Sequence, residues 1–497
     1  MAKYDAIIIG CGMSGLAAAR QLAPFKVAIL EARNRLGGRI LTADSSMGLK
    51  EPVDLGGSMV HGYREGNPVA RLITAELGME VHVPEGAKGL VYGPEGPLAE
   101  AEATSLFATS AQNSFVPQPG TSPSTSVADL LLPKLAHDPR LVALARTAEI
   151  GAGVALEEQS AKFAGFEQGF KGTDGFPVGG YGEVIANLAS DVKASGGEIH
   201  LDTVVTSIED VEEGEEAATY VKVTTENGQT YTARAVISTI PHAVLQQNPP
   251  KFSPPLPTSF TSALARLRTG ALEKIVLSYP SAWWPSPDQN GSFLLLPLKE
   301  TTGDNTSSDS LETLFASTVI PVTSFERIGM NPHPTLLAYI GASAARVLAR
   351  CSTDEVADAF HAYLVKRLGG GGGGGESSTI PTPSTKLVTT WLSDPFSLGA
   401  TSAPVTLPNS SSSTTASANG DEYSTPLDYI LVSRPAWQGR LGFAGEHTDL
   451  DNHGSVAGAF VSGKREGLRV KELLERVAAQ EAEEEEAAKA AAAASRL

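Results

Sequence analysis

The chain has very few of the residues that build disulfide frameworks and thiolate metal sites. It contains two cysteines, Cys11 and Cys351, among 497 residues. Two thiols cannot form several bridges or a four-thiolate metal centre. We therefore expect a reducing compartment and no metal.

Long apolar runs are also missing. No stretch approaches the roughly 18 apolar residues that a membrane-spanning helix needs. The apolar segment at residues 6–9 is too short for the core of a signal peptide and has no cleavage site after it. We expect a soluble, intracellular protein without a membrane partner.

Positive charge is in deficit, with 38 Lys and Arg against 56 Asp and Glu and a formal net charge of -18. Nucleic-acid binding depends on a surplus of cations, so we expect no nucleic-acid partner. An acidic protein suits a cationic substrate. Acidity also keeps proteins soluble, and the tail at 481–486 supplies part of it, so charge alone leaves the substrate open.

The first 30 residues have the pattern of a strand, a glycine-rich turn, a helix and a second strand. The segments 4–9 and 27–30 are apolar, and 14–22 is rich in alanine. The turn at 10–15 is Gly-Cys-Gly-Met-Ser-Gly, which fits GxGxxG. Its glycines allow a tight turn, close approach of a pyrophosphate and close helix packing, and the helix N-terminus attracts the anion.

Glu31 ends the second strand about 20 residues after the first glycine, where a carboxylate can accept hydrogen bonds from ribose hydroxyls. The segment therefore predicts a parallel α/β sheet that binds a dinucleotide. NAD and FAD share this pattern, so the motif leaves the choice between them open.

Further elements follow from periodicity and composition. We expect helices within 127–155, at 182–193 and at 352–368, the last with a Ser352 and Glu355 capping box, and strands at 198–208, 220–225, 235–238, 271–279 and 336–341. Three polar or glycine-rich stretches, 301–310, 369–376 and 409–420, are predicted to be flexible insertions. From 472 onward the Ala/Glu composition favours a solvated helix or disorder.

Six segments together resemble the flavin-containing amine oxidase superfamily, most closely its peroxisomal polyamine oxidases. They are 31–39 (Glu-Ala-Arg-Asn-Arg-Leu-Gly-Gly-Arg), 54–62 (Asp-Leu-Gly-Gly-Ser-Met-Val-His-Gly), 201–208, 270–277, 390–401, and 443–448 together with 454–459. The resemblance implies an α/β FAD-binding domain, Rossmann-like and of the glutathione-reductase type, interwoven with an α+β substrate domain. The segment around Gly399 has no cysteine, so FAD is expected to be bound noncovalently.

The resemblance also implies a division of the chain. The FAD-binding domain is expected at 1–80, 196–250 and 430–472, the substrate domain at 81–195 and 251–429, and an acidic tail at 473–497.

The resemblance of these motifs implies which residues of this chain form the active site. Lys274, expected to hold a water against the flavin, and His61 are the predicted catalytic residues, and His61, Thr401 and Ser455 are the predicted substrate contacts. The predicted cofactor contacts are Gly10, Gly12, Met13, Ser14, Gly15, Glu31, Ala32, Arg33, Gly38, Arg39, Leu55, Gly56, Gly57, Ser58, Val205, Trp391, Glu446, Ser455 and Val456.

Two departures from the family bear on the substrate. Thr401 and Ser455 stand where many members have the tyrosines of an aromatic cage, so the cage is absent or rebuilt. This disfavours a small monoamine and leaves room for a long secondary amine. The expected reaction is oxidation of a polyamine such as spermine, spermidine or an N-acetylated form by molecular oxygen, which gives an aldehyde, a shorter amine and hydrogen peroxide. The carboxylates that would hold the distant ammonium groups are not assigned.

Other activities stay open: a lysine-specific histone demethylase, an L-amino-acid oxidase or a monoamine oxidase. Demethylases share the flavin motifs but carry an extra helical domain and a coiled-coil insertion, and this sequence shows no sustained heptad. The chain ends in Ser495, Arg496 and Leu497, which is similar to the Ser-Lys-Leu address of the peroxisomal import receptor. We expect a peroxisomal location, or a cytoplasmic one if the address is not recognised.

Overall fold

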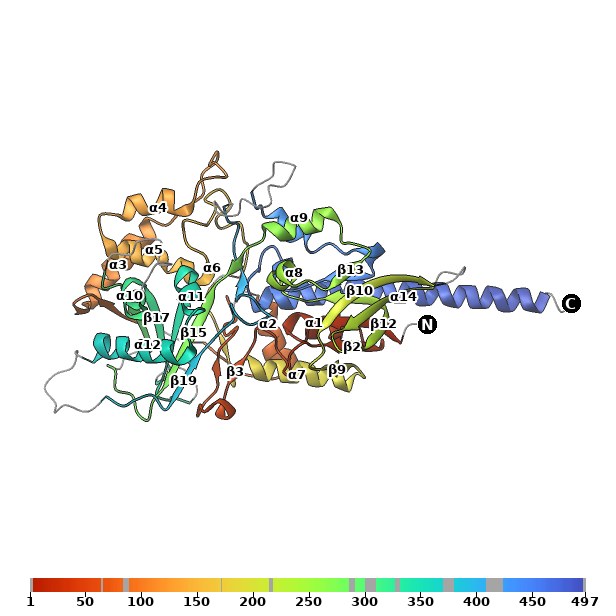
Figure 1. The fold of residues 1–497 in the computed structure, drawn as a ribbon, viewed down its shortest axis with the longest axis horizontal. Helices are drawn as coiled ribbons and strands as arrows, with labels where there is room; N and C mark the ends of the chain where they lie inside the picture. Colours follow the sequence, from red (N-terminus) through yellow and green to blue (C-terminus); the bar gives the residue numbers. More distant parts are fainter. Residues whose placement is uncertain are drawn as a thin grey trace.

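The computed structural model describes residues 3–494 except 64–65, 84–88, 171, 214–217, 286–290, 300–309, 327–330, 370–379 and 408–422. The predicted insertions at 301–310, 369–376 and 409–420 lie almost wholly outside the described residues, as does the terminal Ser495 to Leu497. Two mixed sheets, each flanked by helices, form the two lobes seen in Figure 1.

The first sheet contains the expected nucleotide-binding unit. Its strand order is β13-β10-β11-β12-β1-β2-β9, and β21 also pairs with β12. The strands are β1 (Tyr4–Ile9), β2 (Val27–Leu30), β9 (Glu198–His200), β10 (Val205–Glu213), β11 (Ala218–Thr225), β12 (Thr230–Ser238), β13 (Lys251–Ser253) and β21 (Leu441–Phe443). Pairing is parallel through β21, β12, β1, β2 and β9, and β11 is antiparallel to both of its neighbours.

The central strands are buried on both faces, which explains their continuous apolar sequences. All four residues of β2 are buried. On one face pack α1 (Met13–Gln21), α7 (Tyr181–Ala194) and the start of α14 (Val456–Ala494), and on the other α9 (Thr258–Arg266) and α13 (Leu427–Leu431). The sheet is thus the middle layer of three (Figure 1). Its last strand in the sequence, β21, pairs with β12, which in turn pairs with the first strand, β1.

The second sheet belongs to the other lobe. Its strand order is β19-β15-β18-β17-β16-β6-β7. The strands are β6 (Leu90–Gly93), β7 (Gly96–Pro97), β15 (Leu272–Ser278), β16 (Ser292–Leu295), β17 (Ile320–Ser324), β18 (Thr335–Gly341) and β19 (Thr385–Val388). Their buried face packs with α10 (Leu311–Ser317), α11 (Ala342–Leu348) and α12 (Thr353–Leu368).

The remaining elements connect these layers. They are the helices α2 (Pro68–Arg71), α3 (Glu100–Gln112), α4 (Val127–Leu135), α5 (Pro139–Arg146), α6 (Ala148–Ala152) and α8 (His242–Gln247), and the strand pairs β3 (Thr42–Ala43) with β4 (Val53–Asp54), β5 (Val81–His82) with β8 (Phe176–Pro177), and β14 (Thr269–Gly270) with β20 (Thr401–Ser402).

Most expected elements are present, and one differs. The predicted strand at 198–208 is two strands, because β9 pairs with β2 whereas β10 pairs with β11. The helices predicted within 127–155 are three short ones, α4 to α6. The capping box at Ser352 and Glu355 is confirmed, with both reciprocal hydrogen bonds formed.

Two expected domain limits also need adjustment. β13, just past residue 250, pairs with β10 in the first sheet, and α7, which was assigned to the substrate domain, packs against α1. The apolar residues of α7 are buried on one face of the first sheet, and Phe252 of β13 packs partly buried on the other. The first lobe therefore holds more of the chain than expected.

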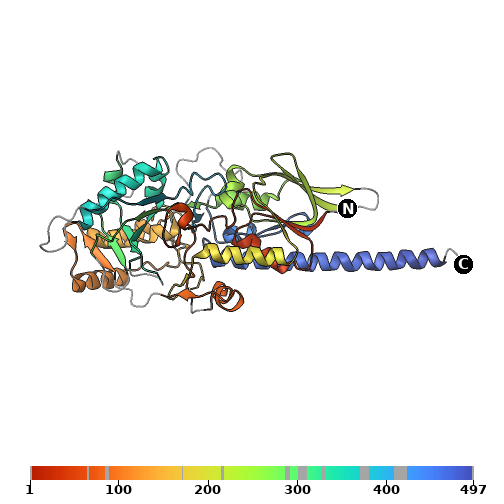
Figure 2. The ribbon, with the colours of Figure 1, turned by 90° about the horizontal axis from the view of Figure 1, so that it is seen from below.

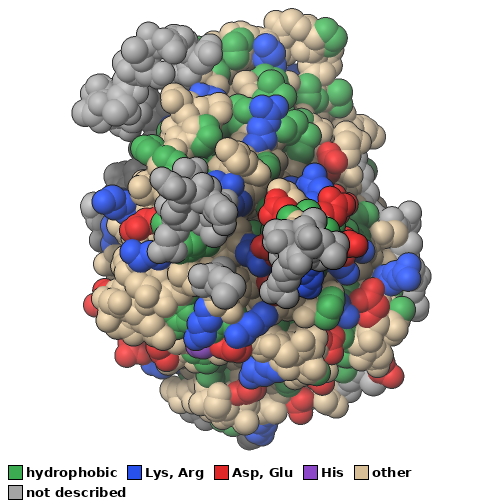
Figure 3. All heavy atoms as spheres, turned by 90° about the vertical axis from the view of Figure 1, so that its right-hand side faces the viewer, with side chains coloured by type: hydrophobic (Ala, Val, Ile, Leu, Met, Phe, Trp, Pro, Cys, Tyr) green, Lys and Arg blue, Asp and Glu red, His purple; other side chains and the backbone are tan. Residues whose placement is uncertain are grey.

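Helix α14 is the longest element. Its first part is buried against α1, and its later residues, from Gln480 to Ala491, are exposed. Figures 1 and 2 show this end projecting from the body toward the C-terminus. Around that end Lys and Arg side chains are interspersed with Asp and Glu (Figure 3), so opposite charges share the surface. No helix in the described part of the chain is long and apolar enough to cross a membrane.

A buried arginine ties α12 to the second sheet. The guanidinium of Arg367 is 8% exposed and donates hydrogen bonds to the carbonyls of Leu296 (2.8 Å), Tyr92 (3.0 Å) and Gly93 (3.1 Å) and to the Tyr363 hydroxyl (3.0 Å). Four acceptors therefore depend on one side chain.

We predict that Arg367→Met destabilises the protein by roughly 3 kcal/mol, because buried acceptors lose a charged donor. The neighbouring Lys366→Met should change stability by less than about 0.5 kcal/mol, since its pair with Glu312 is exposed. Urea denaturation followed by tryptophan fluorescence measures both, because Trp284 is buried in the same core cluster. Equal midpoints for the two variants would contradict this account of Arg367.

Candidate functional site

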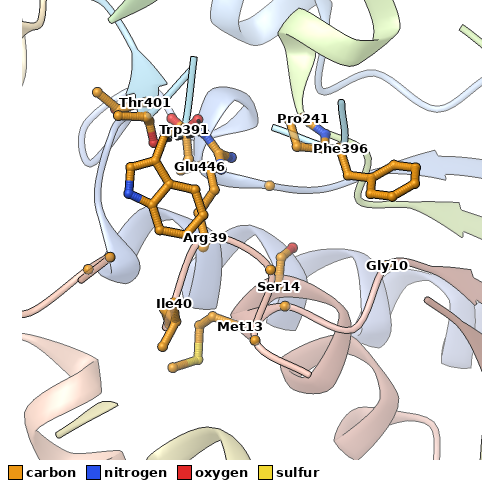
Figure 4. Close-up of a pocket in the computed structure, with 18 of the residues that line it drawn as sticks. Gly10, Met13, Ser14, Arg39, Ile40, Pro241, Trp391, Phe396, Thr401 and Glu446 are labelled. Carbon is orange, nitrogen blue, oxygen red and sulfur yellow. Dashed lines mark hydrogen bonds and ion pairs between the residues drawn. The ribbon is translucent and has the colours of Figure 1, made fainter. Parts of the chain in front are cut away.

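A cavity of about 550 Å³ follows the glycine-rich turn after β1 and runs to the start of α14. This volume is typical of sites for cofactors and small molecules. Figure 4 shows Gly10, Pro241 and Phe396 toward one end, Trp391, Thr401, Arg39 and Glu446 toward the other, and Met13 and Ser14 between them.

The turn at 10–15 is built for close approach of an anion. Gly10 has φ +102°, a conformation that favours glycine, and a Cβ at Gly15 would lie 2.0 Å from the Gly10 carbonyl oxygen. The Ser14 hydroxyl at the start of α1 is buried, lines the cavity and has no hydrogen-bond partner among the described residues. A pyrophosphate would supply the missing partner and meet the helix N-terminus.

Glu31 lies at the cavity wall and is 3% exposed. Its carboxylate accepts hydrogen bonds from the backbone N–H of Cys11 (2.7 Å) and of Arg33 (2.9 Å). These bonds hold the carboxylate at the end of β2, where the sequence predicts a ribose contact.

The two arginines among the predicted cofactor contacts, Arg33 and Arg39, each have a carboxylate partner within the protein. Arg33 donates to Asp394 (2.7 Å), and Arg39 donates to Glu446 (2.8 Å) and to the Ala400 carbonyl (3.3 Å). Both side chains line the cavity. Their positions therefore depend on segments near 394–400 and 446, as well as on the loop that carries them.

Glu446 is buried, and its two oxygens accept hydrogen bonds from Arg39, from the Ser402 hydroxyl and N–H, and from the Gly454 N–H (2.7 Å). Burial opposes its ionisation, but the charge of Arg39, with support from His447, His242 and Ser402, holds the pKa of Glu446 well below its usual range. The carboxylate is therefore charged at neutral pH.

Lys274 lies on β15 and is 4% exposed at the same cavity. Its Nζ donates to the carbonyls of Asp54 (2.9 Å) and Gly56 (2.8 Å) and contacts the Ser58 hydroxyl at 3.3 Å. These contacts account for the three hydrogens of an ammonium. A water held by Nζ would therefore have to replace the longest of them, the one with Ser58.

The burial of Lys274 makes its ammonium easier to deprotonate than that of an exposed lysine. Burial lowers the pKa of Lys274 to about 8, against the opposing charge of Asp54. Burial also raises the pKa of Asp54 to about 6, although the Thr42 hydroxyl and Lys274 oppose this. A lysine with such a pKa can take up and release protons near neutral pH, which an exposed lysine cannot.

Trp391 is 6% exposed and lines the cavity. Glu273 holds the turn that carries it: the carboxylate accepts hydrogen bonds from the Thr389 hydroxyl (2.5 Å) and from the N–H of Trp391 (3.1 Å) and Leu392 (3.0 Å). Adjacent residues of β15 thus point to opposite sides, one toward the cavity and one toward the turn behind it.

His61, Thr401 and Ser455 come together where the first cavity meets a second one. The imidazole of His61 is about half exposed, and its Nδ1 lies 3.2 Å from Asp174. Ser455 Oγ donates to the Asn452 carbonyl and accepts from the Gly458 N–H, so it also caps α14.

The structure brings the predicted site residues together. Every one of them lines the 550 Å³ cavity except Gly15, which packs beneath the turn against Gly10. Val205 lies there with Thr203 and Val204.

Several residues at the site were not singled out from the sequence. Tyr339 lines the cavity, with its ring centroid 5.3 Å from Lys274 Nζ, and Glu273, Asp54 and Asp174 hold site residues in place. Asp54 and Glu273 lie within recognised motifs, and that was the available signal for them. The contribution of Tyr339 depends on strand pairing, which the sequence pattern leaves unspecified.

One group of possible metal ligands occurs among the described residues. Ligand atoms of His242, Glu446 and His447 lie within 4.8 Å of one another. The Glu446 oxygens already accept hydrogen bonds from the protein, and the Arg39 cation 2.8 Å away opposes a second cation. We assign no metal to this group.

We predict that Gly15→Ala abolishes retention of FAD, the expected cofactor, because the new Cβ would force the Gly10 carbonyl out of place. Absorbance of the purified protein near the flavin bands measures retention. Gly151→Ala is the matched control, since Gly151 lines the same cavity and a Cβ there meets nothing within 4 Å. Equal flavin content in the two variants would contradict the role of the turn.

Comparison with known proteins gives relatives along nearly the whole chain. Polyamine oxidase 5 from Oryza sativa subsp. japonica is 28% identical over 92% of this chain and 85% of its own length, and Polyamine oxidase 4 from the same plant is 29% identical over 92% and 86%. Lysine-specific histone demethylase 1 homolog 3 from Arabidopsis thaliana is 29% identical over 94% of this chain, which spans only 30% of that relative.

The model of the family described as flavin containing amine oxidoreductase matches residues 13–470. This range begins within the glycine-rich turn and takes in Lys274 and the Arg39–Glu446 pair, all of which face one cavity. The chain therefore belongs to the flavin containing amine oxidoreductase family.

Proposed function

We propose that the protein oxidises polyamines at a secondary amine and passes the electrons to molecular oxygen. The products would be an aldehyde, a shorter amine and hydrogen peroxide. The observation that carries this proposal is the continuity of the cofactor cavity with a second cavity of about 400 Å³. With FAD in the first cavity, the second one gives room for a substrate that extends well beyond the atoms being oxidised.

FAD is the cofactor of this family, and the cavity fits it through the glycine turn, the unpartnered Ser14 and the buried Glu31. When bound, FAD supplies the two-electron oxidation of the amine carbon. The glycine turn and the Arg39–Glu446 pair would hold it, and hydrolysis of the oxidised amine would release the aldehyde and the shorter amine.

The residues around the reacting nitrogen must also favour its neutral form over its ammonium form. Only a neutral amine has the lone pair that stabilises the developing cation on the neighbouring carbon. Trp391 and Tyr339 line the cavity and are buried or nearly so, and such surroundings disfavour an ammonium. Lys274, with its pKa of about 8, can accept or return a proton at Nζ during the cycle.

The relatives support both a polyamine substrate and its main alternative, because polyamine oxidases and lysine-specific histone demethylases resemble this chain to a similar degree. The polyamine oxidases are covered over most of their length, and the demethylase homolog over 30%. This difference favours the polyamine.

A peroxide assay with spermine, spermidine, their N-acetyl forms, benzylamine, L-amino acids and a methylated lysine peptide tests the proposal. We expect peroxide with at least one polyamine. Activity confined to amino acids or to the peptide would overturn the substrate assignment.

In the same assay, Lys274→Met should slow flavin reduction or its reoxidation by more than about tenfold, because a buried proton-exchanging group is lost. The matched control is Lys386→Met on the neighbouring strand β19, an exposed lysine that pairs with Asp358. Stopped-flow absorbance separates the two half-reactions. Wild-type rates in both would remove Lys274 from the mechanism.

We also propose that Ser495, Arg496 and Leu497 direct the protein to peroxisomes through their import receptor. Support comes from the sequence and from α14, whose described end at Ala494 stands away from the body (Figure 1). A fluorescent protein fused at the N-terminus should localise to peroxisomes with the full chain and spread through the cytosol when these residues are deleted. Unchanged puncta after deletion would refute the address.

A further inference from the structure

The second cavity begins where the cofactor cavity ends. The five residues that line both are His61, Gly151, Thr401, Gly454 and Ser455. A linear molecule that presents one nitrogen to the cofactor can therefore extend past Thr401 and Ser455 into the second space. What lines that space decides which end groups it accepts.

The lining of the second cavity is acidic. Its described residues include the carboxylates Glu167 and Asp451 and no lysine or arginine. The Ser160 hydroxyl at its wall is 2% exposed and has no hydrogen-bond partner among the described residues. A buried hydroxyl without a partner marks a place where a polar ligand completes the hydrogen bonding.

Glu167 is held in a fixed position by a histidine. His453 Nε2 lies 3.1 Å from Glu167 Oε1, and its Nδ1 lies 3.4 Å from the Ser402 hydroxyl. The imidazole stacks on Phe166, with ring centroids 5.5 Å apart and planes at 9°, and lies 4.6 Å from the Tyr429 ring. Contacts with these two aromatic rings, together with the two hydrogen-bond contacts, hold the imidazole in one orientation, and the ring in turn fixes the carboxylate.

Glu167 is also charged and accessible. Burial opposes its ionisation, but the hydrogen bond and charge of His453 keep the pKa of Glu167 below its ordinary value. The histidine side chain is 7% exposed, whereas 27% of the glutamate side chain remains exposed. A ligand can therefore reach the carboxylate while the histidine stays behind it.

We propose that Glu167 binds a second, positively charged nitrogen of the substrate, remote from the nitrogen that is oxidised, and that His453 is the residue that positions Glu167. This inference rests on the proposed function and makes it more specific. It assigns the substrate class as amines with at least two nitrogens, one neutral at the cofactor and one cationic in the second cavity. A charge-assisted hydrogen bond in a partly buried cavity gives such a site its strength.

Two probes that differ only in the second nitrogen test this assignment: 1,8-diaminooctane and octylamine. The diamine has the same number of chain atoms between its nitrogens as spermidine has between its terminal ones. Calorimetric titration of the FAD-loaded protein, with the flavin reduced by dithionite beforehand and oxygen excluded, measures binding without oxidation of the amine. Wild-type protein should bind the diamine more tightly than the monoamine.

Glu167→Gln should weaken binding of the diamine by about tenfold to a hundredfold and leave that of octylamine unchanged, because only the diamine uses the carboxylate. The matched control is Glu198→Gln, which also removes a carboxylate beside a histidine, here 3.2 Å from His200 and outside both cavities. Its affinity for both probes should equal that of wild type. Flavin absorbance and the thermal midpoint check that each variant is folded and loaded.

His453→Ala tests the positioning role. It should reduce the preference for the diamine by several-fold while Glu167 is still present. In the Glu167→Gln background the same change should have no further effect, since there is no carboxylate left to orient. His453→Gln, which can still donate to Glu167, should restore part of the preference.

The possible outcomes separate this inference from the proposed function. The inference would be overturned if the Glu167→Gln protein kept the wild-type preference for the diamine. It would also be overturned if Asp451→Asn abolished that preference and Glu167→Gln did not. If wild type oxidises no polyamine at all, the proposed function fails. If it oxidises polyamines but Glu167→Gln keeps the preference, only the assignment of Glu167 fails.

Discussion

The buried ion pair between Arg39 and Glu446 joins segments that are more than 400 residues apart in the chain. Ser402 and Gly454 bind the same carboxylate, so the loop after β2, the strand β20, the turn after β21 and the start of α14 converge on one side chain. Removing one partner of such a pair would leave a buried charge without compensation. The cavity keeps its shape because these four segments cannot move independently.

Strand β15 links this region to the second lobe. It carries Lys274 toward the cavity and Glu273 toward the turn of Trp391, and its antiparallel partner β18 places Tyr339 opposite Lys274. A single register error in this pairing would exchange the faces of these side chains. The second core, which lies behind this sheet, therefore sets the geometry of the site as well as the stability of the lobe.

Local signals were enough to predict much of this arrangement. The glycine turn, the position of Glu31 and the capping box of α12 each depend on residues close together in sequence, and all three are present as expected. The motifs around Lys274, His61 and Glu446 predicted residues that line one cavity, because a family resemblance carries long-range information. The family's combination of a Rossmann-like FAD domain with a substrate domain agrees with the two helix-flanked sheets.

What the sequence did not reveal depends on contacts between distant segments. Glu167 and His453 lie 286 positions apart, and neither belongs to a recognised motif. The carboxylate partners of Arg33 and Arg39 are more than 350 residues away. The break in the predicted strand at 198–208 arises because its two halves have different neighbours. Such pairings follow from packing, which no local pattern encodes.

Helix α14 begins at Val456, next to the cavity residue Ser455, and continues without interruption to Ala494. At 1.5 Å per residue its 39 residues extend about 58 Å, so the described end of the chain stands far from the cavity (Figure 1). A surface tether or affinity label attached to the exposed part of this helix would leave the cavity unobstructed. The same part of the helix is a suitable anchoring point for immobilising the protein.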